Sequence, residues 1–385
     1  MKTFVTDEMI LTRDIPTTAG SKMLDGYVSL FEAEVLTRLN AAGYTFTKKC
    51  DVGEFAIDLL GETSYNGAKY TDGKLTNKSA EAILNGDADA AVCLDVNGYV
   101  RRAAAQSNLV SIKPTYGTVS RYGIIPVACS GDTISVMAKC PDLCREMLTV
   151  MSGHDNKDGT SHSDEVCAQI NNAKPIRKVA LLKSMTEGAD TEVIEKLNAF
   201  AESLKNSGIE VIEVDDEIIC QAKIAWNVLM SAELCNNVSR YDGVKYGYRA
   251  ENFSGIDELY TNSRTEAFGE LLKTAILFGS EALSTENYMP VYDKSLRIRR
   301  VICERLAEIF ASYGAILMPV CSKTAYTESD VKENKYICFD EASYIAPASI
   351  SGLPALVFGG VQLIGPAFSE NALFELAKIY EGEDR

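Results

Sequence analysis

Apolar and polar residues alternate along the chain in patterns that predict both strands and helices. Short apolar runs bounded by polar or turn residues predict strands at 90–94, 109–112, 123–127, 178–182, 210–214, 315–320, 355–358 and 360–364. Apolar residues at three- and four-residue steps predict helices at 21–42, 141–151, 191–207, 218–238, 291–313 and 371–380. Polar and glycine-rich stretches at 53–78 and 153–164 are typical of irregular connections.

The order of these elements favours an α/β fold. A strand at 178–182, a helix at 191–207 and a strand at 210–214 predict a parallel pair joined by a crossover helix. The two last strands, 355–358 and 360–364, are expected to pair with each other. No fixed-period repeat and no Pro/Ser-rich linker divides the sequence, so a single domain over 1–385 is expected.

The chain is acidic, with 38 Lys and Arg against 54 Asp and Glu, a net charge of −16. This charge opposes binding along a nucleic acid, so no direct nucleic-acid partner is expected. No apolar run reaches the roughly 18 residues of a membrane span, and no membrane contact is predicted. The first eight residues turn acidic too early for a secretion signal, so a cytoplasmic location is expected.

Cysteines and histidines do not form a recognisable metal motif. The 11 cysteines are scattered and odd in number, which is typical of reduced thiols. Cys140 and Cys144 have a spacing that would place two ligands on one helical face, and His154 and His162 share one polar stretch. Neither pair has further ligands nearby. We therefore expect buried thiols and loop histidines, no metal and no other cofactor.

Five stretches of the sequence, taken together and in order, resemble the amidase signature family, and most of all its branch of amidotransferase A subunits. They are Thr17–Tyr27 (TTAGSKMLDGY), Lys113–Gly123 (KPTYGTVSRYG), Ser239–Arg249 (SRYDGVKYGYR), Ser263–Gly269 (SRTEAFG) and Ser351–Pro354 (SGLP). The resemblance extends from about Asp7 to Glu381 and implies one α/β/α domain with a mixed central sheet covered by helices. The family's helices ahead of its catalytic lysine are missing, so the resemblance implies a fold truncated at its N-terminus.

The resemblance also implies where catalytic groups belong. The family hydrolyses amides with a serine nucleophile, a cis-serine and a lysine, because a serine hydroxyl needs a base and a neutral buried lysine supplies it. Aligned without gaps, the lysine position is Asp7, the cis-serine position is Leu75 and the nucleophile position is Tyr99. A slip of one residue would place Thr76 at the cis-serine position. In either register no complete triad is present.

The substrate-binding positions implied by the family are altered as well. The stretch that carries its glutamine-binding arginine is Lys273–Ile276 here, and its ammonium-binding aspartate aligns with Ala342, beside Asp340 and Glu341. Some positions still match the family pattern. These are the register-holding residues Asp95, Gly98, Arg101 and Ala104, and the candidate substrate-binding remnants Tyr246, Tyr248 and Gly98.

Three hypotheses follow from this pattern. The first is a catalytically degenerate paralogue that binds a protein partner or a small ligand without hydrolysis. The second is a divergent amidase or amidotransferase A subunit with a replaced nucleophile, for which Cys93, Ser79, Ser107 and Tyr99 are candidates. The third is a structural component of an amidotransferase-like assembly. The bulk of Tyr99 and Leu75 predicts that the old pocket is partly filled.

Two acidic segments have simpler interpretations. The run Asp215–Glu217 lies between a predicted strand and a predicted helix, where carboxylates favour a helix N-terminus. The last five residues, 381–385, are expected to form a frayed tail.

Overall fold

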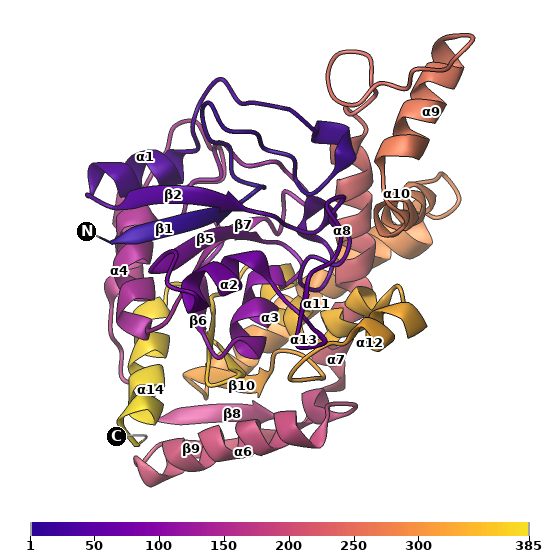
Figure 1. Ribbon diagram of the computed structural model, residues 1–385. Coiled ribbons are helices and arrows are strands. Elements are labelled where there is room, and N and C mark those ends of the chain that lie inside the picture. Colours follow the sequence, from indigo (N-terminus) through magenta and orange to yellow (C-terminus); the bar gives the residue numbers. More distant parts are fainter. Residues whose placement is uncertain (1, 384–385) are drawn as a thin grey trace.

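The computed structural model describes residues 2–383, and one large mixed β-sheet lies at its centre (Figure 1). The sheet has ten strands in the order β2-β1-β5-β7-β6-β11-β12-β10-β8-β9. Their bounds are β1 Thr3–Asp7, β2 Thr45–Cys50, β5 Ala90–Asp95, β6 Val110–Lys113, β7 Thr133–Ala138, β8 Lys178–Leu182, β9 Glu210–Val214, β10 Ala315–Pro319, β11 Ala355–Phe358 and β12 Val361–Ile364. A separate small hairpin pairs β3 Tyr70–Thr71 with β4 Lys74–Leu75.

The two ends of the sheet are parallel and its middle is antiparallel. β1 runs parallel to both β2 and β5. From β5 the order β7, β6, β11, β12, β10 is antiparallel at each step. β10, β8 and β9 are parallel again. The expected mixed sheet is confirmed, as are the parallel pair β8–β9 and the antiparallel pair β11–β12.

Helices cover both faces of the sheet, because successive strand residues point to opposite sides. In β8, Val179 and Leu181 pack with α1, α4, α6 and α14, whereas Ala180 and Leu182 face the layer of α2, α3, α8, α10, α11 and α13. The α-helices are α1 Glu34–Ala41, α2 Lys78–Leu84, α3 Tyr99–Gln106, α4 Pro141–Met151, α5 Asp164–Cys167, α6 Thr191–Asn206, α7 Glu217–Cys220, α8 Ala222–Val238, α9 Ile256–Ala267, α10 Glu270–Ala282, α11 Lys294–Phe310, α12 Glu328–Glu333, α13 Ile337–Ser351 and α14 Glu370–Glu383. The single α/β domain expected from the sequence is therefore confirmed.

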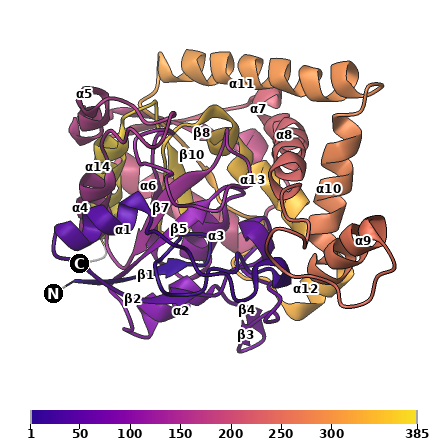
Figure 2. The ribbon, with the colours of Figure 1, turned by 90° about the horizontal axis from the view of Figure 1, so that it is seen from above.

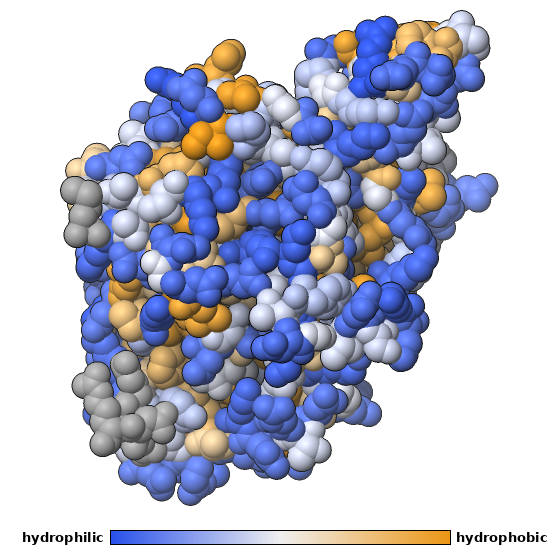
Figure 3. Space-filling view, viewed as in Figure 1, coloured by the Kyte–Doolittle hydropathy of each residue, from blue (hydrophilic) through white to orange (hydrophobic). Residues whose placement is uncertain are grey.

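Short helical turns complete the fold. They are the 3-10 turns η1 Lys22–Leu24, η2 Glu54–Ala56, η3 Ala168–Asn171 and η4 Lys183–Thr186, and the π-helical turn η5 Tyr288–Asp293 that leads into α11. Viewed from above, α11 and α10 run along two adjoining edges of the molecule, with α9 beyond the end of α10 (Figure 2). The face drawn in Figure 3 is largely hydrophilic, with apolar residues in separate groups. Within 2–383, no helix is both long and apolar enough to span a bilayer.

The helix expected over 21–42 is wrong. Only η1 and α1 are helical there, and between them the chain is bridged back to earlier residues, Val28 to Pro16 and Ser29 to Arg13. Gly26 has a φ of 73°, a left-handed conformation that favours glycine and interrupts a helix. Leu30, one of the residues at helical spacing, is 90% exposed, so the spacing does not mark a buried helix face.

The strand expected at 123–127 is also wrong. That segment makes one isolated antiparallel bridge, from Ile124 to Ile10. After β6, the chain returns to the sheet only as β7. Pro126 has no backbone N–H to donate to a strand ladder. At the other end of the chain, α14 continues to Glu383 where a frayed tail was expected, and 384–385 lie outside the described residues.

A glycine sets the distance between α8 and α10. A Cβ on Gly279 would lie 2.0 Å from the Ser231 carbonyl oxygen. Replacing glycine by alanine in an open helix is stabilising by roughly 0.5–1 kcal/mol. Here we expect Gly279→Ala to destabilise the fold by about 1–3 kcal/mol, because the helices must separate. Chemical denaturation measures this, with the exposed Ser280→Ala as control; equal stability of Gly279→Ala and wild type would contradict the close approach.

Candidate functional site

The three positions that the resemblance assigns to the triad lie at the ends of different elements. Asp7 is the last residue of β1, Leu75 ends β4 and Tyr99 begins α3. Because β1 and β5 are parallel neighbours, Asp7 and the turn from β5 into α3 lie at the same edge of the sheet. The exposed fractions of Asp7, Leu75 and Tyr99 are 0%, 4% and 1%. All three side chains therefore belong to the interior.

A left-handed glycine makes the turn that presents Tyr99. Gly98 has a φ of 74°, and a Cβ on it would lie 2.4 Å from Cγ2 of Ile345 in α13. The Tyr99 hydroxyl donates to the Leu60 carbonyl oxygen at 3.2 Å. Ile345 thus fills the space that a side chain at position 98 would need. The hydroxyl of Tyr99, its one polar side-chain group, has a hydrogen-bond partner.

A buried ion pair holds this turn in place. Arg101 donates from Nε to Asp95 Oδ2 at 3.1 Å and from Nη2 to Asp95 Oδ1 at 3.0 Å, and both side chains are 0% exposed. Arg101 also donates to Gln362 Oε1 at 2.8 Å and to Ser349 Oγ at 2.7 Å. Although burial opposes ionisation, the Arg101 charge and hydrogen bonds hold the pKa of Asp95 below its ordinary value.

Asp7, to which the resemblance assigns the lysine position, has its carboxyl group bound by the backbone. It accepts from the Met9 N–H at 3.1 Å and from the Leu94 N–H at 2.8 Å. Burial raises its pKa to about 7, against the lowering effect of those two donors. This carboxyl group therefore anchors β1 to β5.

The replacement nucleophiles expected near this site are partly brought together. Cys93 Sγ lies 3.4 Å from Ser79 Oγ, and both residues are 1% exposed. Burial, followed by the charge of Asp7, raises the pKa of the Cys93 thiol well above its ordinary value. The thiolate is the reactive form of cysteine, so this environment disfavours attack by Cys93.

The other two candidates do not combine with that pair. Ser107 caps the C-terminal end of α3, at the opposite end of the helix from Tyr99. Burial, with the charges of Asp58 and Asp7, raises the pKa of Tyr99 well above its ordinary value, which keeps the phenol protonated. Neither group has the activation that a nucleophile needs.

One buried lysine has the neutral character of a base but lies on another strand. Burial, followed by the Arg101 charge, lowers the pKa of Lys113 to about 7. Its Nζ, at the end of β6, donates to the Leu353 carbonyl at 2.9 Å and to the Pro114 carbonyl at 3.3 Å. β6 is separated from β1 by β7 and β5 in the sheet order. Lys113 therefore joins β6 to the turn before β11, and no hydroxyl or thiol partner is recorded for it among the described residues.

Tyr246 and Tyr248 lie around the first of the five motif segments. The Tyr248 N–H donates to the Met23 carbonyl at 2.8 Å, and Lys22 Nζ lies 4.0 Å from the centre of the Tyr248 ring. Tyr246 is 42% exposed and packs edge-on against Tyr241. These contacts explain both tyrosines by packing between segments, and a substrate role for them stays a prediction.

The altered substrate positions have contacts of their own. Lys273 donates to the Thr265 carbonyl at 3.2 Å, and Ala342 is 0% exposed in the core. Asp340 pairs with Lys223 at 2.9 Å. The Glu341 carboxylate is bound by neutral donors.

Sequence reasoning missed Glu54, which joins two of the motif segments. Its carboxyl group accepts from Ser21 Oγ at 2.6 Å and from the Gly269 N–H at 2.9 Å. Burial raises its pKa to about 7. The next residue, Phe55, has a φ of 54°, which is strained for a side chain of this size. Nothing in the irregular composition of 53–78 marks Glu54, because its partners lie far away in sequence.

The cysteine and histidine pairs are engaged with protein groups. Cys144 is buried, with its Sγ 3.6 Å from the Val110 carbonyl oxygen. A ring nitrogen of His154 lies 3.0 Å from the His162 carbonyl oxygen, and the His162 ring packs edge-on against Phe368. No group of three potential ligands suited to a metal ion occurs within 2–383.

Comparisons with known proteins agree with this architecture. The family model described as Amidase matches residues 7–374. The A subunit of glutamyl-tRNA(Gln) amidotransferase from Coxiella burnetii is 33% identical over 396 residues, covering 98% of this chain and 82% of that protein. The protein of the same name from Lachnoclostridium phytofermentans is 34% identical over 400 residues, covering 97% and 81%. The crystal structure of the A subunit of glutamyl-tRNA(Gln) amidotransferase from Thermotoga maritima superposes with a TM-score of 0.81 at 26% identity, covering 99% of this chain and 82% of that one.

Removing one partner of the buried pair of Asp95 and Arg101 should strongly lower the free energy of unfolding. Arg101→Met would leave Asp95 buried without its counter-charge, which costs about 3–5 kcal/mol of the free energy of unfolding. The matched control is Arg300→Met, whose ion pair with Glu304 joins side chains that are 82% and 59% exposed and should contribute less than about 1 kcal/mol. Urea denaturation followed by circular dichroism compares the two variants. Similar losses in both would show that the Asp95 pair does not hold the turn.

The raised pKa of Asp7 predicts a pH dependence of stability. The folded protein keeps this proton up to about pH 7, while the unfolded chain releases it near the ordinary value of 3.8. Between these values the folded state binds more protons, so this group makes the free energy of unfolding fall as pH rises and level off above about 7. In Asp7→Asn the free energy of unfolding should fall less between pH 4 and pH 7 than in the wild type. Denaturation at steps from pH 4 to pH 8 measures this.

The exposed Asp72→Asn is the control for this measurement and should keep the wild-type profile. Other buried acids contribute to the absolute profile, so the quantity of interest is the difference between wild type and Asp7→Asn. A difference that does not change with pH would mean that Asp7 titrates as it does in the unfolded chain.

Proposed function

The chain belongs to the amidase family, and we propose that it is a catalytically degenerate member that binds a protein partner or a small ligand without hydrolysing an amide. One observation carries this proposal: Asp7, Leu75 and Tyr99, to which the motif register assigns the three triad positions, are all buried. Amide hydrolysis by a serine needs a nucleophile and a base in contact with each other and with substrate. Burial denies that contact to whatever residue stands there.

The residues that match the family pattern around position 99 also support this proposal. Asp95, Gly98 and Arg101 still form the turn that would present a nucleophile. The family's scaffold is therefore kept while the reacting groups differ. A fold preserved without its proton relay remains useful as a binding surface, since binding needs shape and charge but no activated hydroxyl.

A divergent amidase with a replaced nucleophile is the second candidate function. It is compatible with the family, and the proximity of Cys93 and Ser79 is the observation in its favour. The burial of both residues and the raised pKa of the Cys93 thiol weigh against it.

A protein partner forms part of the proposal. Each of the relatives named above is the A subunit of an amidotransferase, and that name describes one component of an assembly. The chain spans about four fifths of the length of these relatives, with 82% of the Coxiella burnetii protein covered. The cytoplasmic location expected from the sequence also remains a prediction.

An activity assay tests the loss of hydrolysis. Purified protein incubated with glutamine or small aliphatic amides should release no more ammonia than the Tyr99→Phe, Ser79→Ala and Cys93→Ala variants do. The physical reason is that none of these hydroxyl or thiol groups has both an activating base and access to substrate. Ammonia release that is lost in one of the variants would overturn the proposal and identify the nucleophile.

Thiol labelling provides a second, independent readout. Iodoacetamide added to the folded protein should modify the exposed Cys129 and leave Cys93 intact, as measured by peptide mass spectrometry. Cys129 thus serves as the internal positive control. Modification of Cys93 at the rate of Cys129 under native conditions would favour the replaced-nucleophile function.

A further inference from the structure

The sheet has a topological switch point away from the triad positions. From β8 the chain passes through α6 to β9 on one side, and it later returns through α11 to β10 on the other side of β8. α6 and α11 pack on opposite faces of these parallel strands. In open α/β sheets, ligands bind in the crevice outside the carboxyl ends of strands at such a point.

A cavity of about 390 Å³ lies at this place. The segment after β8 lines it with Ser184 and Glu187, and the segment after β10 contributes Ser322. Helix α13 contributes Asp340, Glu341, Ser343 and Tyr344. The volume is within the range of small-molecule sites, roughly 300–1,000 Å³. Hydroxyl groups and carboxylates from three separate chain segments therefore converge on one space.

Two of the three carboxylates that line the cavity lack a cation within residues 2–383, whereas the third, Asp340, is paired with Lys223 at 2.9 Å. Glu341 is 4% exposed and accepts from the Ser322 N–H at 2.9 Å, from Ser322 Oγ at 2.5 Å and from the Tyr326 hydroxyl at 2.5 Å. No ion pair is recorded for Glu341 or Glu187 in the described part of the chain, and no Lys, Arg or His of that part lines the cavity. Buried carboxylates in proteins are normally paired with a positive charge. The two carboxylate oxygens of Glu341 accept three hydrogen bonds, so they can accept one more.

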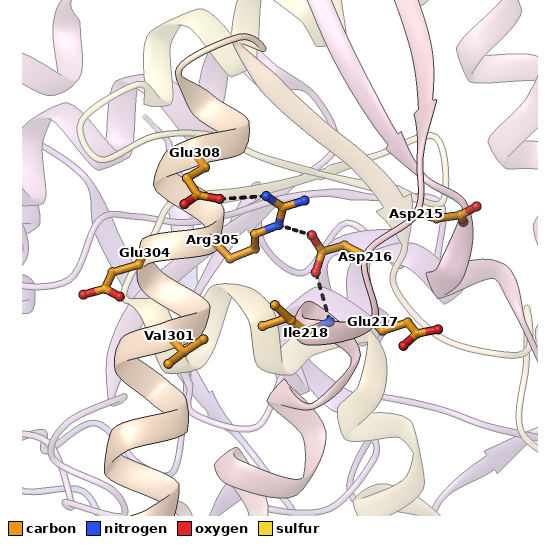
Figure 4. Close-up of a pocket in the computed structure, with 8 residues that line it drawn as sticks. All are labelled: Asp215, Asp216, Glu217, Ile218, Val301, Glu304, Arg305 and Glu308. Atoms are coloured by element: carbon orange, nitrogen blue, oxygen red, sulfur yellow. Dashed lines mark hydrogen bonds and ion pairs between the residues drawn. The ribbon is translucent and has the colours of Figure 1, made fainter.

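A second pocket lined by carboxylates contains an arginine that pairs with them. It lies between the start of α7 and α11, with a volume of about 320 Å³. Figure 4 shows Arg305 between Asp216 and Glu308, with hydrogen bonds to both. Asp216 also caps α7, as the acidic run 215–217 predicted, by accepting from the Ile218 N–H at 3.0 Å. In this pocket Arg305 pairs with two carboxylates, whereas Glu341 and Glu187 of the switch-point cavity have no ion pair within the described residues.

The cavity differs from the site at which the family's ammonium-binding aspartate belongs. The motif register assigns that position to Ala342, beside Asp340 and Glu341; Ala342 is 0% exposed, belongs to the same apolar core as Tyr99 and does not line the cavity. Glu341, the neighbouring residue on α13, lines the cavity instead. The two positions thus belong to different sites of one helix.

We propose that the switch-point cavity binds a small organic cation of the alkylamine class. The ammonium group is held by Glu341 at the buried end and by Glu187 at the rim, while the hydroxyls of Ser184, Ser343 and Tyr344 bind polar groups of the ligand. This site does not depend on the loss of amide hydrolysis, because it shares no side chain with the triad positions. Activity at Tyr99 or Cys93 and amine binding here can fail separately.

Isothermal titration calorimetry with putrescine (1,4-diaminobutane) tests the proposal on the full chain. We expect saturable binding of putrescine and none of 1,4-butanediol, which has the same length but no charge. Glu341→Gln keeps the side-chain size and should weaken putrescine binding at least tenfold, because a charge-assisted hydrogen bond is lost. Equal binding of the diol, or no saturable binding of putrescine, would overturn the proposal.

Glu217→Gln is the matched control, since it removes one carboxylate from the pocket of Figure 4 and changes the net charge equally. It should leave the affinity unchanged within twofold. Glu187 is exposed, so Glu187→Gln should not affect the stability of the fold. This second variant should weaken putrescine binding severalfold. A loss of affinity as large in Glu217→Gln as in Glu341→Gln and Glu187→Gln would mean that putrescine responds only to overall charge.

Discussion

The buried pair of Asp95 and Arg101 is the interaction on which this part of the molecule depends. It ties the end of β5 to α3 and, through Gln362 and Ser349, to β12 and α13. A charge pair without solvent is favourable only when its geometry and remaining hydrogen bonds are complete. The turn that holds residue 99 is therefore fixed by side chains other than that of residue 99 itself.

In the proposed degenerate member, this framework holds the fold while Asp7, Leu75 and Tyr99 stand at the positions that the motif register assigns to the triad. Two of these side chains make defined internal contacts: Asp7 binds two backbone N–H groups, and Tyr99 donates to the Leu60 carbonyl. A serine in place of Tyr99 would leave a void, and a lysine in place of Asp7 would bury an amine against two N–H donors. Restoring one catalytic group alone would thus cost stability without restoring a relay.

The sequence predicts those parts of the fold whose pattern is local. The unit β8–α6–β9 and the pair β11–β12 follow from short apolar runs and nearby turns. The helix over 21–42 fails because spacing alone does not register the backbone break at Gly26. Helix α13 escapes prediction because most of its residues are buried, which leaves only a short polar side. The assignment of the triad positions from the motif register stays a prediction, and the contact of Ser79 with Cys93 requires the packing of α2 on the sheet, which no local pattern encodes.

Helix α13 separates two regions with opposite properties. Ile345 covers Gly98 and Ala342 is buried in the core, so one side of the helix closes the edge of the sheet at β5 and α3. Glu341 and Tyr344 line the open cavity at the ends of β8 and β10. Arg101 Nη1 donates to the Ile345 carbonyl at 3.1 Å, which joins this helix to the buried ion pair. The buried pair that holds the turn before α3 is thus also joined to the helix that carries the carboxylate of the cavity.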